Sequence, residues 1–224
     1  MTLVLLATLA AAPDPALLER IAERTRAVET FTRNAQLSMT IVADELDSEG
    51  KSTKHTEAVV RVSRTDGKPA RELISATENG KDVTAEKREE MDKERDKNGK
   101  NDRQQASPFH PDERAKYAFS MLAPSPAAPN LVRIAFQPAG EKTSELMIGD
   151  ASVDPQTGEL VRMSMRPSKN PSFVDNLFIE IELDAQTPAG RAASKITAKG
   201  AGGFLFIKKR FAVVTTISDY RALE

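Results

Sequence analysis

Alternation of apolar and polar residues with a period of two is the strongest pattern in this 224-residue chain. Apolar side chains at every second position share one face of a β-strand, so such stretches predict half-buried strands. The alternation recurs in residues 35–43, 58–62, 132–136, 177–183 and 204–217. Turn sequences separate these stretches, among them Asn79-Gly80, in which both residues tolerate a positive φ. The pattern predicts roughly nine to eleven strands, with sequence neighbours paired in antiparallel fashion.

A single stretch has a helical period instead. In residues 16–31 the apolar side chains lie on one face and the charged ones on the other, which predicts an amphipathic helix of about four turns. A sheet of so many strands with one core helix must curl, because strand twist accumulates across it. We therefore predict a mainly β (α+β) fold: a single strongly curved antiparallel sheet that forms a half-barrel or incomplete barrel, with the N-terminal helix packed on its concave face.

Residues 1–12 form an apolar run that ends in small residues and is followed by Pro13. This pattern is typical of a secretory signal peptide with its cleavage site, although no Lys or Arg precedes the run. The alternative is a buried or frayed N-terminal segment. The run is too short to span a bilayer of about 30 Å. We predict a signal peptide over residues 1–12, one domain over residues 13–224, periplasmic localisation and no transmembrane span.

Charge and cysteine content narrow the classes of partner. The chain has 32 Lys and Arg residues against 33 Asp and Glu residues, a net charge of -1, so it has no overall positive field that would recruit nucleic acid. There is no cysteine, so the fold has no disulfide and the exported chain has no thiol to carry a lipid. We expect a soluble protein that does not bind nucleic acid.

No motif for catalysis or metal binding stands out. The two histidines, His55 and His110, have no neighbours at the spacing of a metal site, and we predict both to be surface residues. No serine nucleophile motif is present, and the glycine-rich residues 200–203 are interpreted as a hairpin turn because no helix follows them to hold a phosphate. We expect no catalytic residue, no metal, no cofactor and no enzymatic activity.

Three charged segments leave alternatives open. Residues 84–103 carry mixed charges with almost no apolar residue, which favours a solvated helix or loop over a partner-binding arm. Glu180, Glu182 and Asp184 share one side of a strand, where an exposed polar face is favoured over an acid pair or a calcium site. The basic triplet 208–210 marks the end of a core strand or, alternatively, meets phospholipid headgroups or an acidic partner.

The order of these elements resembles a known family. The chain combines a signal, an amphipathic helix, a β-meander, an Asn-Gly hairpin and a charged excursion with the turn Val-Asp-Pro-Gln-Thr-Gly-Glu-Leu at 153–160 and a long final strand. Over nearly the whole mature chain this resembles the outer-membrane lipoprotein-sorting and carrier superfamily, the LolA/LolB-like proteins. The resemblance implies an unclosed barrel with helices as a lid and a role in outer membrane biogenesis. Carrier members accept lipoprotein acyl chains in an apolar lumen, and other relatives regulate envelope stress.

The function predicted from the sequence is binding of lipid or of an acylated protein on the concave face of the sheet. The apolar residues that we expect to line this face are Ile134, Phe136, Met163, Met165, Ile179 and Ile181. Burial of an acyl chain there would contribute about 0.8 kcal/mol per methylene. The alternative is a regulatory or scaffolding module that binds another envelope protein.

Overall fold

The structure is a computed structural model that describes residues 11–65, 68–98, 106–204 and 207–223. Its elements are α1 (Pro15–Thr32), β1 (Ala35–Leu46), β2 (Ser52–Thr65), β3 (Lys68–Glu78), β4 (Lys81–Asp82), α2 (Thr84–Asn98), η1 (Arg114–Lys116), β5 (Tyr117–Leu122), β6 (Val132–Pro138), β7 (Met147–Val153), β8 (Leu160–Pro167), β9 (Val174–Glu182), β10 (Ala185–Thr187), β11 (Gly190–Ala192), β12 (Lys195–Phe204) and β13 (Ile207–Ala222).

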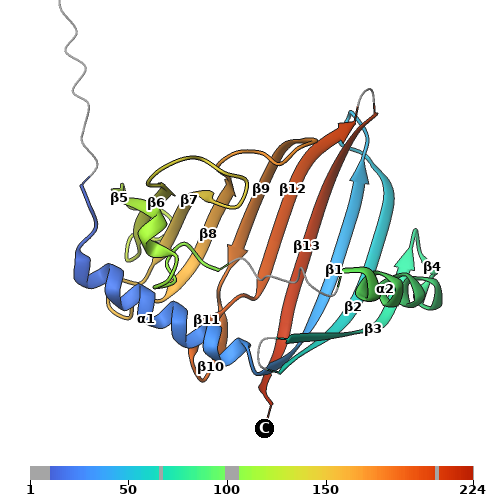
Figure 1. Cartoon of the computed structure of the whole chain (residues 1–224), viewed down its shortest axis with the longest axis horizontal. Helices are drawn as coiled ribbons and strands as arrows, with labels where there is room; N and C mark the ends of the chain where they lie inside the picture. Colours follow the sequence, from blue (N-terminus) through green and yellow to red (C-terminus); the bar gives the residue numbers. More distant parts are fainter. Residues whose placement is uncertain (1–10, 66–67, 99–105, 205–206, 224) are drawn as a thin grey trace, which may run out of the picture.

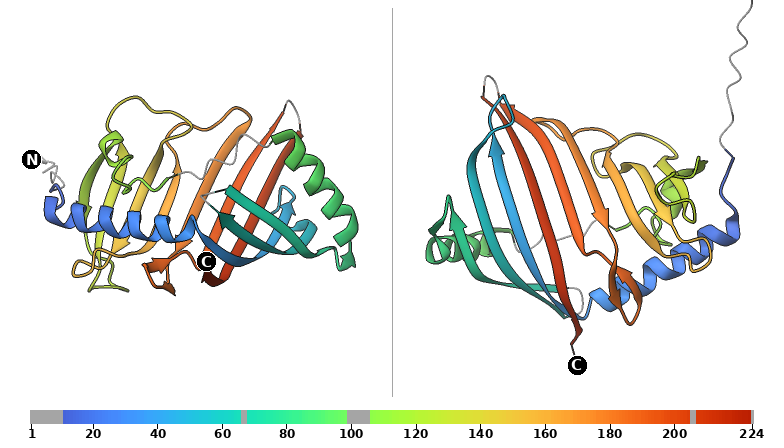
Figure 2. Two further views of the ribbon diagram at one scale, coloured as in Figure 1. Left: turned by 60° about the horizontal axis from the view of Figure 1, so that its bottom comes forward. Right: turned by 180° about the vertical axis from the view of Figure 1, so that it is seen from behind.

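One large sheet forms the body of the protein (Figure 1). It has 11 strands in the order β4-β3-β2-β1-β13-β12-β9-β8-β7-β6-β5, and every pairing is antiparallel. The final strand β13 lies between β1 and β12, so it joins the first half of the chain to the second. The edges do not meet, and Figure 2 shows the sheet bent around α1. The predicted half-barrel with an N-terminal helix is confirmed.

The two faces of the sheet differ in polarity. On the concave face, directly paired residues are apolar across neighbouring strands, as in Met163, Ile181 and Ile196 on β8, β9 and β12. Their sequence neighbours on the convex face form ion pairs: Glu180 with Arg162 at 2.6 Å and Glu182 with Lys195 at 3.3 Å. Glu180 and Glu182 of β9 therefore take part in ion pairs with the neighbouring strands on the convex face.

Helix α1 closes one side of the concave face. The Asp14 carboxylate accepts a hydrogen bond from the Ala16 N–H at 2.9 Å, and Pro15 follows in the first turn, so the helix begins with a capped end. The side chains of Leu17 and Ile21 are buried against the sheet. The β7–β8 turn packs against α1 at Arg20. Gly158 of this turn has φ +75°, and a Cβ at this position would lie only 2.8 Å from the Arg20 backbone.

Two apolar clusters fill the concave side. The first, under the N-terminal part of α1, includes Phe109, Ile134 and Phe136; the second, under α2, includes Val62 and Leu73. Of the two structures favoured for the charged segment at 84–103, helix or loop, its described residues form a helix, α2. It packs against the second cluster through Met91, and the Arg88 Nη2 donates to the Leu73 carbonyl at 2.9 Å. Residues 99–103 of the predicted excursion lie outside the described residues.

The sequence-based interpretation of residues 200–203 as a hairpin turn is wrong. These residues belong to β12, where Gly200 pairs with Phe211 of β13 and Leu177 of β9. A Cβ on Gly200 would lie 2.6 Å from the Phe211 ring, so the absence of a side chain provides the space that this ring occupies. The glycines thus serve close packing within a strand.

The prediction that His110 is a surface residue is also wrong. Its side chain is buried, with 8% of the residue exposed, because the loop before η1 folds onto the first cluster and carries Phe109 into it. The His110 Nδ1 accepts the Asp112 N–H at 3.2 Å, and Nε2 lies 3.5 Å from the Glu29 carboxylate.

Most of the predicted signal peptide, residues 1–10, lies outside the described residues; the Ala11 carbonyl accepts the Met121 N–H at 2.8 Å.

Candidate functional site: a cavity between α1 and the sheet

A cavity of about 490 Å³ lies between α1 and the concave face, where the two apolar clusters meet. This size falls within the common range of small-molecule sites, about 300–1,000 Å³. Its floor consists mainly of Met, Ile and Leu side chains from six strands of the large sheet. They are Leu37 and Met39 of β1, Met147 of β7, Leu160, Met163 and Met165 of β8, Ile179 and Ile181 of β9, Ile196 of β12 and Ile217 of β13, with Leu183 just after β9.

The structure brings together four of the six residues predicted to line the site. Met163, Met165, Ile179 and Ile181 lie in the cavity wall. Ile134 and Phe136 are on the same concave face but are fully buried in the first cluster, where the Phe109 ring lies 5.7 Å from the ring of Phe136. They are therefore core residues outside the cavity.

The sequence did not reveal the helical and charged part of the wall. Thr25 and Val28 of α1 line the cavity, as does the short β11 segment, which contacts α1. The helical period of residues 16–31 identified an inward face but not which of its residues would border an empty space. The segment 106–108 completes this side, and no strand or helix pattern in the sequence marks it.

Charged side chains gather where α1 meets the β7–β8 turn and β11. Arg24 lines the cavity and donates from Nε to the Thr157 carbonyl at 3.3 Å. Glu159 and Arg191 also line it, with the Arg191 Nε 3.5 Å from a Glu159 carboxylate oxygen. The apolar interior therefore has a polar border on this side, which is the arrangement that suits an amphipathic ligand.

Two further polar groups lie in the cavity wall. The Tyr220 hydroxyl donates to the Ala193 carbonyl at 2.8 Å, and burial raises the pKa of Tyr220 to about 12, so the phenol stays neutral. Thr25 is 7% exposed, and its hydroxyl has no hydrogen-bond partner among the described residues. Both groups are uncharged, so they add no charge to this part of the mainly apolar wall.

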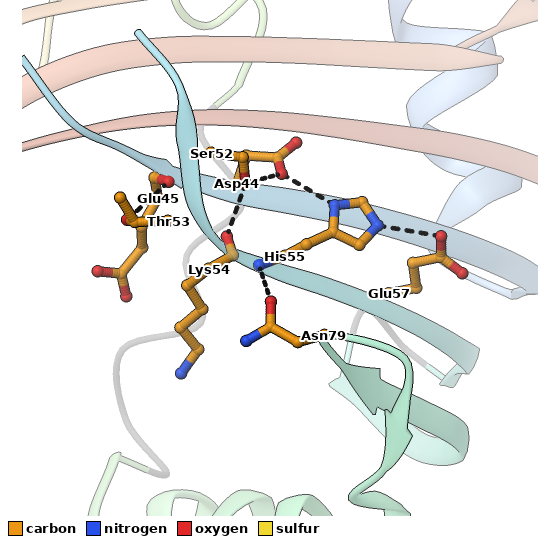
Figure 3. Close-up of polar contacts among 8 residues, drawn as sticks. All are labelled: Asp44, Glu45, Ser52, Thr53, Lys54, His55, Glu57 and Asn79. Atoms are coloured by element: carbon orange, nitrogen blue, oxygen red, sulfur yellow. Dashed lines mark hydrogen bonds and ion pairs between the residues drawn. The ribbon is translucent and has the colours of Figure 1, made fainter. Parts of the chain in front are cut away.

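Several polar side chains surround His55 on the convex face of the sheet, away from the cavity (Figure 3). The ring lies between two carboxylates, with Nδ1 2.9 Å from Asp44 and Nε2 3.1 Å from Glu57. The hydrogen bond with Asp44, followed by that with Glu57, raises the pKa of His55 above its usual 6.5. Asp44 also accepts from the Ser52 hydroxyl at 2.7 Å, and the pKa of its carboxyl is lowered by Ser52 and His55.

We expect His55 to titrate above pH 6.5 and to make stability depend on pH. Because the folded pKa is raised, the protonated ring stabilises the fold below pH 6.5, and this contribution is lost as pH rises through the folded pKa. NMR titration of the ring protons measures the pKa. In Asp44→Asn, which removes the carboxylate that raises the pKa of His55 most, this pKa should fall toward 6.5; an unchanged value would contradict the assignment.

No cluster of three or more His, Cys, Asp or Glu side chains in the described part of the chain is arranged to hold a metal ion. Among those same residues, neither helix has both the length and the apolar character of a membrane span. A smaller depression on the convex face is lined by serines and by Arg133, whose guanidinium is bound to Asp150 at 2.9 Å.

Comparison with known proteins gives structural likenesses alone. No family model and no curated protein matches the chain. It is similar to a proposed outer membrane lipoprotein-sorting protein domain from Vibrio parahaemolyticus, with 11% identity over 92% of this chain and 91% of that chain and a TM-score of 0.46. A DUF1329 family protein from Desulfovibrio piger shows 9% identity over 95% and 94%, with a TM-score of 0.42.

A third similar structure is the MucA/MucB complex of Pseudomonas aeruginosa, with 12% identity over 93% of this chain and 98% of that chain and a TM-score of 0.26. A lipoprotein-sorting domain is thus among the similar structures. These likenesses concern the course of the backbone, so the ligand of this chain is inferred from its own side chains.

Proposed function

We propose that the chain is a non-enzymatic periplasmic binding protein that holds the acyl chain of a lipid or of a lipidated protein between α1 and the concave face of its sheet. The observation that carries the proposal is the cavity of about 490 Å³ with its floor of Met, Ile and Leu side chains. Methionines suit a ligand of variable shape, because the unbranched thioether side chain adapts to irregular surfaces.

Energetics support an acyl chain as the ligand. Each methylene transferred from water into an apolar site contributes about 0.8 kcal/mol, so a modest stretch of chain offsets the entropy lost on binding. The charged border near Arg24, Glu159 and Arg191 leaves a place for the polar end of the molecule in contact with water. An acyl chain exposed to water in the periplasm is unfavourable, so a protein that buries the chain in an apolar cavity would keep the lipid in solution.

A cavity-filling substitution tests the proposal. We expect Ile179→Trp to weaken binding of the neutral apolar probe N-phenyl-1-naphthylamine by more than about tenfold, because displacing even two methylenes' worth of contact costs roughly 1.6 kcal/mol. The measurement is fluorescence titration of the purified protein. The control is Phe178→Trp, the adjacent residue of β9, whose side chain is 46% exposed on the convex face and does not line the cavity.

Equal affinities of the two variants would overturn the cavity as the binding site. Native mass spectrometry of gently purified protein gives an independent readout, with co-purified lipid expected in the wild type and less of it in Ile179→Trp. A wild-type protein that neither retains lipid nor binds the probe would refute the proposed function.

A further inference from the structure

We propose that the cavity prefers amphiphiles with an anionic head, and that Arg24 binds this head at the border of the cavity. The inference rests on the proposed function, since it specifies the chemistry of the ligand's polar end. The shared chemistry is a carboxylate or phosphate attached to a long acyl chain. Arginine suits both groups, because its planar guanidinium donates in a fork that matches two oxygens of the anion.

The charges around the cavity support an anion. Three arginines line it, Arg24, Arg64 and Arg191, against two carboxylates, Glu29 and Glu159. Both carboxylates already have partners within the protein. The Arg191 Nε lies 3.5 Å from Glu159, and Glu29 accepts the Ser107 N–H at 3.4 Å and lies 3.5 Å from the His110 ring. Within the described ranges, no ion pair joins Arg24 to either of these carboxylates, so its positive charge is available to balance an anion on the α1 side of the cavity.

The environment of Arg24 leaves its guanidinium able to receive a ligand. Among the described residues its hydrogen bond is from Nε to a neutral acceptor, the Thr157 carbonyl, at 3.3 Å. That bond positions the side chain over the seam between α1 and the β7–β8 turn and leaves the terminal nitrogens for other acceptors. Thr25, the next residue, and Val28, one turn further along the helix, lie in the cavity wall. The acyl chain of a ligand whose anionic head is bound at Arg24 would therefore continue directly into the apolar interior.

Arg20 provides a matched control within the same helix. It lies one turn before Arg24 and donates from Nη2 to another carbonyl of the same turn, that of Pro155, at 3.0 Å. Unlike Arg24, it does not line the cavity. Arg20→Gln and Arg24→Gln therefore remove comparable contacts between α1 and the β7–β8 turn, but only the second changes the border of the cavity.

The experiment measures displacement of N-phenyl-1-naphthylamine at pH 8 by three ligands below their aggregation concentrations: oleate, oleoyl lysophosphatidic acid and methyl oleate. We expect wild-type protein to bind at least one anionic ligand about tenfold more tightly than the neutral ester, since a charge-assisted hydrogen bond is worth about that factor. Arg24→Gln should abolish this preference with little effect on methyl oleate. Arg20→Gln should keep it. Preference for oleate alone indicates a carboxylate head, and preference for the lysophospholipid alone indicates a phosphate head.

Two results would overturn the inference while leaving the proposed function intact. One is equal binding of all three ligands by the wild type, and the other is an equal loss of preference in Arg20→Gln and Arg24→Gln. If wild-type protein binds neither the probe nor any of the three ligands, the proposed function fails as well. Thermal unfolding of both variants, expected to match the wild type closely, shows that the comparison concerns folded protein.

Discussion

Phe109→Ala is expected to lower the free energy of unfolding by about 3–5 kcal/mol, the cost of removing a large aromatic side chain from a packed core. Phe109 is 1% exposed and belongs to no helix or strand. Its ring contacts Phe119 at 5.1 Å and Phe136 at 5.7 Å between centroids, and the second contact is edge-on, a favourable geometry for aromatic pairs. The substitution would open a void at the centre of the first cluster.

Urea denaturation measures this change, with Phe178→Ala as the control because its side chain is 46% exposed. We expect the control to cost well under about 1 kcal/mol. A similar loss for the two variants would mean that the loop does not hold Phe109 in the core. The adjacent residues 106–108 line the cavity, so Phe109→Ala should also weaken probe binding, whereas Phe178→Ala should not.

The sequence predicted the sheet well because the alternation of residue types within each strand shows which of its faces is buried. Ile179 and Ile181 alternate with Phe178 and Glu180, and a two-faced strand is the simplest structure that separates them. The same logic located four residues of the cavity wall. Periodicity identifies a face but not what covers it, which is why Ile134 and Phe136 were predicted as ligand-binding residues although a loop covers them.

The loop itself could not be predicted from local pattern. Phe109 and His110 stand between two prolines, a composition typical of surface loops, and their burial depends on Phe119 and Phe136, which follow later in the chain. Gly200 shows the same limit. A glycine-rich run indicates a turn unless a ring on a neighbouring strand needs the space, and Phe211 becomes that neighbour only once β12 and β13 are paired.

Charged positions at the cavity border were similarly hidden. Arg20 and Arg24 are the same residue type, and the helical period places both on the charged face of α1, so the sequence predicts both on its solvent side. Only the docking of the β7–β8 turn and β11 against the helix distinguishes them, by placing Arg24 beside the cavity. Contacts between residues more than 130 positions apart decide which arginine can meet a ligand.

Gly149→Ala is expected to destabilise the fold by about 3 kcal/mol or more, although it adds a single methyl group. Gly149 lies in β7 between Phe136 and Met165, its direct partners on β6 and β8. A Cβ at this position would lie 2.8 Å from the Met165 Cα and still closer to the Ser164 carbonyl oxygen. Backbone atoms cannot move aside as the end of a side chain can, so β7 and β8 would have to separate.

The consequence should reach the cavity, because Met165 is part of its wall and its backbone is what the new methyl group would displace. We expect Gly149→Ala to lower the urea midpoint and also to weaken binding of N-phenyl-1-naphthylamine. Gly140→Ala is the matched control, since a Cβ there has no neighbour within 4 Å and its φ is not in the left-handed region. If Gly149→Ala were as stable as Gly140→Ala, the close approach of β7 and β8 that shapes this side of the cavity would be refuted.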